Sequence, residues 1–253
     1  MLSIDLNCDM GEGFGVYGIG NDDLVMSYIT SANVACGFHA SDPLTMWKTV
    51  KLAARYGVAI GAHPSYPDLV GFGRRVMDAT LAEISADVTY QIGALSAFCQ
   101  REGVRLHHVK AHGALYNKAV DTQSVATAIA EAIKMVDPAL TMVCLSNSAM
   151  VTAAQQAGVP YVEEAFADRA YTREGKLVSR SHEGAVLHDP VIIAQRVLEM
   201  VTDKTVVAID GTRISLNAET ICVHGDTPGS FEMIKAIKCM LEEGNVALKA
   251  FGH

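Results

Sequence analysis

Short apolar segments alternate along this chain with longer segments whose apolar residues recur every three or four positions. The short segments predict β-strands near residues 3–8, 32–36, 57–62, 106–110, 141–145, 160–163 and 220–224. The longer segments predict α-helices near residues 42–56, 79–103, 121–136, 147–157, 188–203 and 228–243. Asp42-Pro43 and Thr227-Pro228 are typical helix starts, because a capping side chain precedes a proline in the first turn. This alternation indicates βαβ units around a parallel sheet.

Three segments interrupt the alternation. Residues 64–75 and 165–186 are long loops, and the second is polar with two arginine-bearing turns. Asp210-Gly211 lies between apolar runs in residues 206–217 and predicts a hairpin added to the sheet. No linker or repeat divides the sequence, so we expect one domain over residues 1–253.

Polar residues occupy one face of the first predicted strand, where Asp5, Asn7 and Asp9 alternate with apolar residues. Polar side chains also gather at or just beyond the ends of four later strands: His39 and Asp42, then His63, then His108, Lys110 and His112, and finally His224 and Asp226. The carboxyl ends of all strands of a closed parallel barrel meet at one rim, where active sites lie. An open sheet would bring only some of them together. The pattern therefore favours a β/α barrel with a polar interior.

Composition narrows the class of protein. The chain has 253 residues and a formal net charge of -8, which argues against non-specific binding to nucleic acids or anionic membranes. No apolar stretch approaches the length of a membrane span, and no signal peptide is visible. The six cysteines form no CxxC pair and most lie in apolar segments, as in reduced cytoplasmic proteins.

The rim residues predict a catalytic group. A lysine inside a barrel needs a carboxylate partner or loses its proton, so we expect Lys110 beside Asp9. In this hypothesis Asp9 and His112 activate a water molecule, Lys110 stabilises developing negative charge, and Asp226 belongs to the same catalytic rim. The alternative is a structural ion pair under the cavity.

Other polar residues predict binding sites. Arg74 and Arg75 follow a glycine-rich loop, where one of them could clamp an anion or both could be solvated. We expect Asn7, Glu12, Arg74, Arg75, Asp168 and Arg169 to bind the substrate or its anionic groups. His39, His63 and His224 are candidate ligands of a divalent metal such as Zn²⁺ or Mn²⁺. The GFGVYG match to a dinucleotide motif lacks the acidic residue after the next strand, and there is no P-loop.

Six motifs in order, DLNCDMGEGFG, ANVACGFHASDP, GAHPSYPDLVGFGRR, VKAHGALYN, FADRAY and VHGDTPG, resemble the LamB/YcsF family from about residue 3 to the end. The resemblance implies an irregular, seven-stranded β/α barrel of the glycoside hydrolase/deacetylase type. It also implies the ATP-dependent opening of 5-oxo-L-proline to L-glutamate, with release of ADP and phosphate. Two partner subunits, B and C, are implied with it, and a homo-oligomer is compatible with it.

Two other functions remain compatible with the residues. One is a stand-alone metal-dependent deacetylase or amidohydrolase, which would bind metal tightly and act without ATP. The other is a non-catalytic subunit that presents substrate to its partners, in which case changes at the rim would weaken binding without affecting a chemical step.

Overall fold

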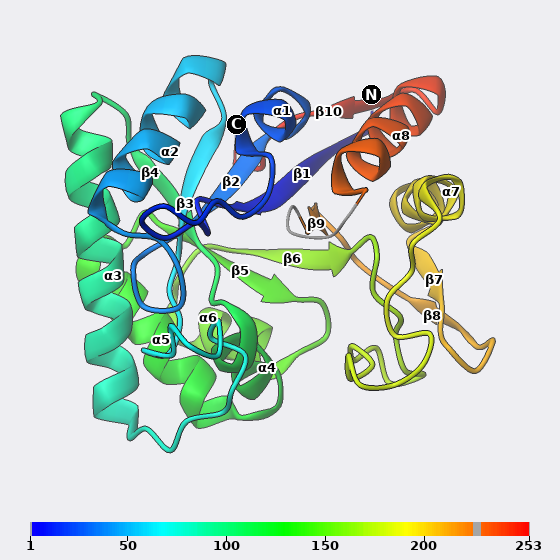
Figure 1. Ribbon diagram of the computed structural model, residues 1–253. Helices are drawn as coiled ribbons and strands as arrows, with labels where there is room; N and C mark the ends of the chain where they lie inside the picture. Colours follow the sequence, from blue (N-terminus) through cyan, green and yellow to red (C-terminus); the bar gives the residue numbers. More distant parts are fainter. Residues whose placement is uncertain (1, 225–228, 253) are drawn as a thin grey trace.

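The computed structural model describes residues 2–224 and 229–252 (Figure 1). Seven parallel strands close into a barrel in the order β1, β2, β3, β4, β5, β6 and β9. Their bounds are Leu2–Met10, Ser31–Ala35, Ala59–His63, Leu106–Val109, Thr141–Leu145, Tyr161–Phe166 and Thr220–Val223. The predicted seven-stranded β/α barrel is confirmed, and each of the seven predicted strands corresponds to one of these.

Helices surround the barrel. They are α1 (Asp22–Val25), η1 (Met26–Tyr28), α2 (Pro43–Tyr56), α3 (Leu81–Arg101), α4 (Gly113–Asp121), α5 (Gln123–Val136), α6 (Ala149–Ala157), α7 (Pro190–Thr202) and α8 (Ser230–Glu243). Asp42 caps α2 ahead of Pro43, as predicted, and accepts hydrogen bonds from the backbone N–H groups of Leu44 and Thr45. None of the helices in the described part of the chain is long and apolar enough to cross a membrane.

β1 closes the barrel. Asp5–Cys8 pair with Thr220–Val223 of β9, and Asn7–Met10 pair with Ser31–Val34 of β2. At its other end β1 pairs in parallel with a further short strand, β10 (Val246–Leu248). β1 therefore pairs with three strands, and two of them, β9 and β10, come from the last part of the chain.

The inside and outside of the barrel differ in polarity. Leu6 and Cys8 of β1 belong to the hydrophobic core that the barrel shares with its helices. Asp5 and Asn7 are buried on the inner face: Ser31 of the neighbouring strand β2 donates to Asp5, and Asn7 reaches Glu164 of β6, which is not a neighbour of β1. The alternation read from the sequence thus marks a polar barrel interior rather than a solvated face.

The structure corrects one prediction and contains elements that the sequence did not predict. The hairpin of β7 (Thr205–Val207) and β8 (Arg213–Ser215) forms, but as a separate two-stranded sheet and not as part of the barrel sheet. α4 and β10 were not predicted. α4 begins at Gly113, directly after His112, without a capping side chain that would mark its start. The predicted helix start at Thr227-Pro228 lies outside the described residues.

Candidate active site

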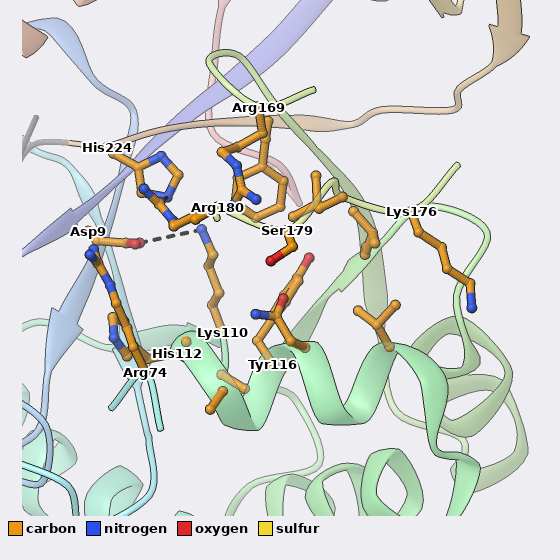
Figure 2. A pocket seen from close by; sticks show the side chains of 18 of the residues that line it. Asp9, Arg74, Lys110, His112, Tyr116, Arg169, Lys176, Ser179, Arg180 and His224 are labelled. Atoms are coloured by element: carbon orange, nitrogen blue, oxygen red, sulfur yellow. Dashed lines mark hydrogen bonds and ion pairs between the residues drawn. The ribbon is translucent and has the colours of Figure 1, made fainter. Parts of the chain in front are cut away.

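A cavity of about 510 Å³ opens at the carboxyl ends of the barrel strands (Figure 2). Small-molecule sites commonly have volumes of about 300–1,000 Å³. The structure brings to this cavity eight residues singled out from the sequence: Asp9, Glu12, His63, Arg74, Lys110, His112, Arg169 and His224. Asp226, which was also expected here, lies outside the described residues.

Lys110 is a buried cation at the base of the cavity, with 2% of its side chain exposed. Its Nζ lies 2.7 Å from Glu164 Oε1 and 3.4 Å from Asp9 Oδ1. It also donates to Asn7 Oδ1 at 3.2 Å and to Cys222 Sγ at 3.0 Å. Two carboxylates thus face one ammonium group in a site that is nearly closed to water.

Lys110 and the neighbouring carboxylates keep one another ionised. Burial alone would lower the pKa of Lys110, but the carboxylates of Asp9 and Glu164 raise it well above its usual value. Burial alone would raise the pKa of Asp9, but His63 and Lys110 hold it well below its usual value. Asp9 and Lys110 are therefore an ionised pair at neutral pH.

A layer of amides lies beneath this ion pair. Asn7 donates to Glu164 Oε1 at 3.1 Å and accepts from Asn33 Nδ2 at 2.8 Å. Asn33 also donates to Asp9 Oδ1 at 2.9 Å. Asn7, which we expected to bind substrate, lies below the cavity with its amide engaged by other side chains. Its place is that of a residue that positions Glu164 and Lys110.

Glu12, His39, His63 and His112 form a second buried group, which we call the histidine cluster. One ligand atom from each lies within 4.8 Å of the others. His39 stacks on His112 with ring centroids 3.8 Å apart. Neither ring nitrogen of His39 makes a hydrogen bond, although the side chain is 0% exposed. Leaving a buried polar atom unsatisfied costs about 1–3 kcal/mol, so the cluster is suited to accept a further partner.

The backbone fixes the protonation of two of these rings. His63 Nδ1 lies 2.7 Å from the carbonyl oxygen of Lys110, and His112 Nε2 lies 2.9 Å from that of Phe72. A carbonyl oxygen only accepts, so both nitrogens carry hydrogen. The other two nitrogens, His63 Nε2 and His112 Nδ1, face each other at 3.0 Å. One more proton, or a metal ion, is needed to relieve the repulsion of their lone pairs.

The donors of the histidine cluster fit a divalent transition metal. Burial lowers the pKa of His112 to about 3 and the pKa of His39 well below its usual value, so both rings are neutral, as metal ligands must be. Imidazoles with one carboxylate are typical ligands of Zn²⁺, Mn²⁺ or Fe²⁺. His224, predicted to bind metal together with His39 and His63, lies instead with Asp9 and Cys222.

His224 belongs to a separate dyad at the cavity wall. Its Nδ1 lies 2.9 and 3.0 Å from the two carboxylate oxygens of Asp168, which is 1% exposed. Its Nε2 lies 3.0 Å from a guanidinium nitrogen of Arg180. Asp168, expected to bind substrate, thus holds a histidine that does line the cavity.

The predicted arginines occupy different places. Arg74 lines the cavity and its guanidinium carbon lies 5.0 Å from the centre of the Phe72 ring. Arg75 is 65% exposed and pairs with Asp68, away from the cavity lining. Arg169 lines the cavity but donates to the carbonyl oxygens of residues 178 and 185, so it also ties down the long loop.

Sequence reasoning missed three cavity or floor residues. Glu164 sits beside Glu163 on β6, and nothing in the sequence says which of the two points inward. Tyr116 lies on α4, which was not predicted, and donates to Glu164 Oε2 at 2.9 Å. Arg180 lies in the polar loop 165–186, whose arginine-bearing turns were the available signal.

Comparison with known proteins places this chain in a family. The sequence model of the LamB/YcsF family matches residues 4–253. The 5-oxoprolinase A subunit of Clostridium beijerinckii is 51% identical over 248 residues, which are 98% of this chain and 97% of that protein. The protein of the same name from Rhodopseudomonas palustris is 52% identical over 251 residues, 99% of each chain.

Solved structures agree. The lactam utilization protein from Thermus thermophilus has a TM-score of 0.95 and 46% identity, and the match covers 99% of this chain and 100% of that one. A putative cellobiose-phosphate cleavage protein from Enterococcus faecalis shares the fold alone, with a TM-score of 0.57, 14% identity, and coverage of 98% of this chain and 96% of that one. The chain belongs to the LamB/YcsF family.

Proposed function

We propose that this chain is one component of an ATP-dependent 5-oxoprolinase, which opens the lactam of 5-oxo-L-proline to L-glutamate. The names of the relatives, the 5-oxoprolinase A subunit and the lactam utilization protein, support the subunit role and a lactam substrate. The observation that carries the proposal is the buried ammonium group of Lys110 at the base of a small-molecule cavity, flanked by Asp9 and Glu164.

Lys110 is suited to bind the lactam oxygen. Water addition to a lactam places negative charge on this oxygen, and a fixed cation in a dry site stabilises that charge. Lys110 has three N–H donors and four acceptors around it: Glu164, Asp9, Asn7 and Cys222 Sγ. The thiol sulfur of Cys222 is the weakest of these acceptors. A lactam oxygen would therefore compete with this sulfur for a donor without breaking an ion pair.

Asp9 is suited to orient the attacking water. One of its oxygens faces Lys110, and the other lies 3.3 Å from His63 Nε2. Asp9 and Lys110 line the same cavity, so a substrate bound there would reach both. Arg74, on the same wall, is our candidate for an anionic group of the substrate, through a bidentate contact.

We propose that ATP is used by the assembled enzyme rather than by this chain alone. Phosphorylation of the lactam oxygen would make the ring carbon a better electrophile. The sequence has no P-loop, so we propose that ATP is used together with two partner subunits, B and C, in the cytoplasm.

The histidine cluster is our proposed metal site. When bound there, a divalent ion would supply a Lewis acid near Asp9. Metal content of the purified full chain, measured by plasma mass spectrometry, tests this. We expect His39→Ala to lose the ion and exposed His188→Ala to retain it, since only His39 belongs to the cluster. Equal metal content in both variants would refute the site.

Reconstitution tests the function. The chain is combined with its partner subunits, and 5-oxoproline-dependent release of glutamate and ADP is measured. We expect Asp9→Asn and Lys110→Met to abolish both products, while Arg173→Met, which changes an exposed ion pair, retains them. Activity on amides without ATP or partners would favour the stand-alone amidohydrolase. Normal turnover in the folded Asp9 variant would favour the binding subunit.

A further inference from the structure

His224 has a protonation state that its two neighbours define. Asp168 accepts on both carboxylate oxygens, so His224 Nδ1 carries the hydrogen. A guanidinium group only donates, so the hydrogen bond from Arg180 requires a lone pair on His224 Nε2. His224 is therefore a neutral imidazole with its basic nitrogen turned toward the cavity.

The ring is held in this orientation. Asp168 is buried and fixes one edge of the ring, as an orienting carboxylate does for a catalytic histidine. The ring of Phe166 stacks against His224 with centroids 5.7 Å apart and planes at 23°. One ligand atom each from His224, Asp9 and Cys222 lies within 4.8 Å of the others. His224 thus lines the same cavity as the carboxylate that we propose orients water (Figure 2).

Arg180 differs from Asp168 in being exposed. It lies on the loop that forms the outer wall of the cavity, next to Ser179 and close to Lys176 in the lining. An exposed guanidinium can exchange a neutral imidazole for a carboxylate, because a charge-assisted bidentate pair is the stronger contact. A bound carboxylate at this wall would therefore draw Arg180 away from Nε2.

We propose that His224 is the general base of the lactam-opening reaction and that Arg180 covers it until the carboxylate of the substrate draws the guanidinium away. This deepens the proposed function and rests on it. Asp168 is a positioning residue, and Arg180 makes the reaction selective for lactams that carry a carboxylate. In 5-oxoproline the carboxylate and the lactam carbon are separated by only two ring atoms, so both reach one wall of the cavity.

His224 Nε2 takes a proton from water as the water oxygen bonds to the lactam carbon. On the free lactam, the π electron pair moves onto the lactam oxygen. When that pair returns and the bond between carbon and ring nitrogen breaks, the nitrogen takes the proton from Nε2, and His224 is neutral again. If the lactam oxygen carries phosphate, the π pair of the C=N bond moves onto the ring nitrogen, which takes the proton from Nε2. The hydroxyl proton of the adduct then passes to the nitrogen as the carbon–nitrogen bond breaks, and a second water releases phosphate from the resulting acyl phosphate.

The first test reads the tautomer directly. In the ¹⁵N-labelled full chain, two-dimensional ¹⁵N–¹H spectra of the histidine rings are assigned by the loss of signals in His224→Gln. We expect a protonated Nδ1 and an unprotonated Nε2. Arg180→Met should shift the Nε2 resonance without changing the tautomer. A protonated Nε2 in the unliganded chain would overturn the proposal whether or not the chain is part of an oxoprolinase.

The second test separates the source of the anion. We expect 5-oxo-L-proline to move the Nε2 resonance toward its position in Arg180→Met. We expect 2-pyrrolidinone, which lacks the carboxylate, and inorganic phosphate to leave it in place. An equal shift with phosphate, or none with 5-oxoproline at a concentration that saturates the assembled enzyme, would refute control by the substrate carboxylate.

The third test uses the reconstituted enzyme. His224→Gln should lower kcat by about 10²–10⁴-fold, the usual range for a general base. Asp168→Asn should also lower kcat, with Nε2 becoming the protonated nitrogen. Arg180→Met should raise KM for 5-oxoproline at least tenfold and should increase turnover of 2-pyrrolidinone, because His224 is then uncovered without a substrate carboxylate. The exposed His188→Gln is the control. Full activity of folded His224→Gln, or equal losses on both lactams in Arg180→Met, would refute the assignment.

Discussion

Removing the charge of Lys110 should destabilise the fold as well as stop the reaction. At an effective dielectric constant of about 20, charges 2.7 and 3.4 Å apart attract by about 6 and 5 kcal/mol, so Lys110 is coupled strongly to both Glu164 and Asp9. Desolvation of the three groups offsets most of this attraction. Lys110→Met removes the attraction and leaves the desolvation, because Glu164 is 0% exposed.

We therefore expect Lys110→Met to lower the free energy of unfolding by about 3–5 kcal/mol, the usual cost of breaking a buried pair. At about 2–4 °C per kcal/mol for a chain of this size, the melting temperature should fall by about 10 °C. Lys110→Met/Glu164→Gln should lose less than the sum of the two single variants, since it removes both charges.

Urea unfolding followed by circular dichroism measures these values. Arg173→Met, in an ion pair whose partners are 65% and 40% exposed, should leave the unfolding midpoint nearly unchanged. If Lys110→Met proves as stable as wild type, or if the losses of the single variants simply add, the buried ion pair does not stabilise the barrel as described. Turnover of Lys110→Met is compared at a temperature where the variant is folded.

Three further outcomes follow from the structure. Burial raises the pKa of Asp5 to about 6, above its unfolded value, so the stability that the protonated carboxyl contributes is lost as pH rises through 6. The free energy of unfolding of Asp5→Asn, measured by urea titration, should therefore rise by about 1–2 kcal/mol relative to that of wild type between pH 5 and 8. A difference between the two that does not change with pH would contradict the pKa shift. Arg74→Lys should raise KM for 5-oxoproline and Arg75→Lys should not, because of these two arginines only Arg74 lines the cavity. Equal KM values for the two variants in steady-state kinetics would refute the role of Arg74. Gly73→Ala should lower the melting temperature and the metal content, because the new Cβ would clash with side chains of the histidine cluster. Gly15→Ala is the control, since Gly15 has a similar φ but open space around it. Equal effects of the two substitutions would show that backbone strain alone is responsible.

The barrel could be predicted because its polar signal is repeated. Asp5, Asn7 and Asp9 alternate on one strand, and polar residues gather near the ends of four others, which only a closed barrel brings together. Glu164 could not be chosen over Glu163, because β6 presents adjacent glutamates and period-two alternation does not say which one faces inward.

The separation of His224 from the other histidines follows from the order of the strands. His39, His63 and His112 follow β2, β3 and β4, which are neighbours in the barrel, whereas His224 follows β9, on the other side of β1. Strand order therefore separates His224 from the histidine cluster. Its contact with Arg180 could not be inferred, because the arginine lies in an irregular loop 44 residues away in sequence.

The closure of the barrel through β1 sets the order in which the chain can become native during synthesis. Asp5 bonds to Thr220, a partner 215 residues later in the sequence, so this edge of β1 stays unpaired until nearly the whole chain has been made. Contacts of such long range form late and slowly, and an unpaired strand edge is a site of aggregation. Charged and amide side chains along one face of β1 make that waiting strand a poor template for other chains. The residues that build the candidate active site thereby also protect the nascent protein.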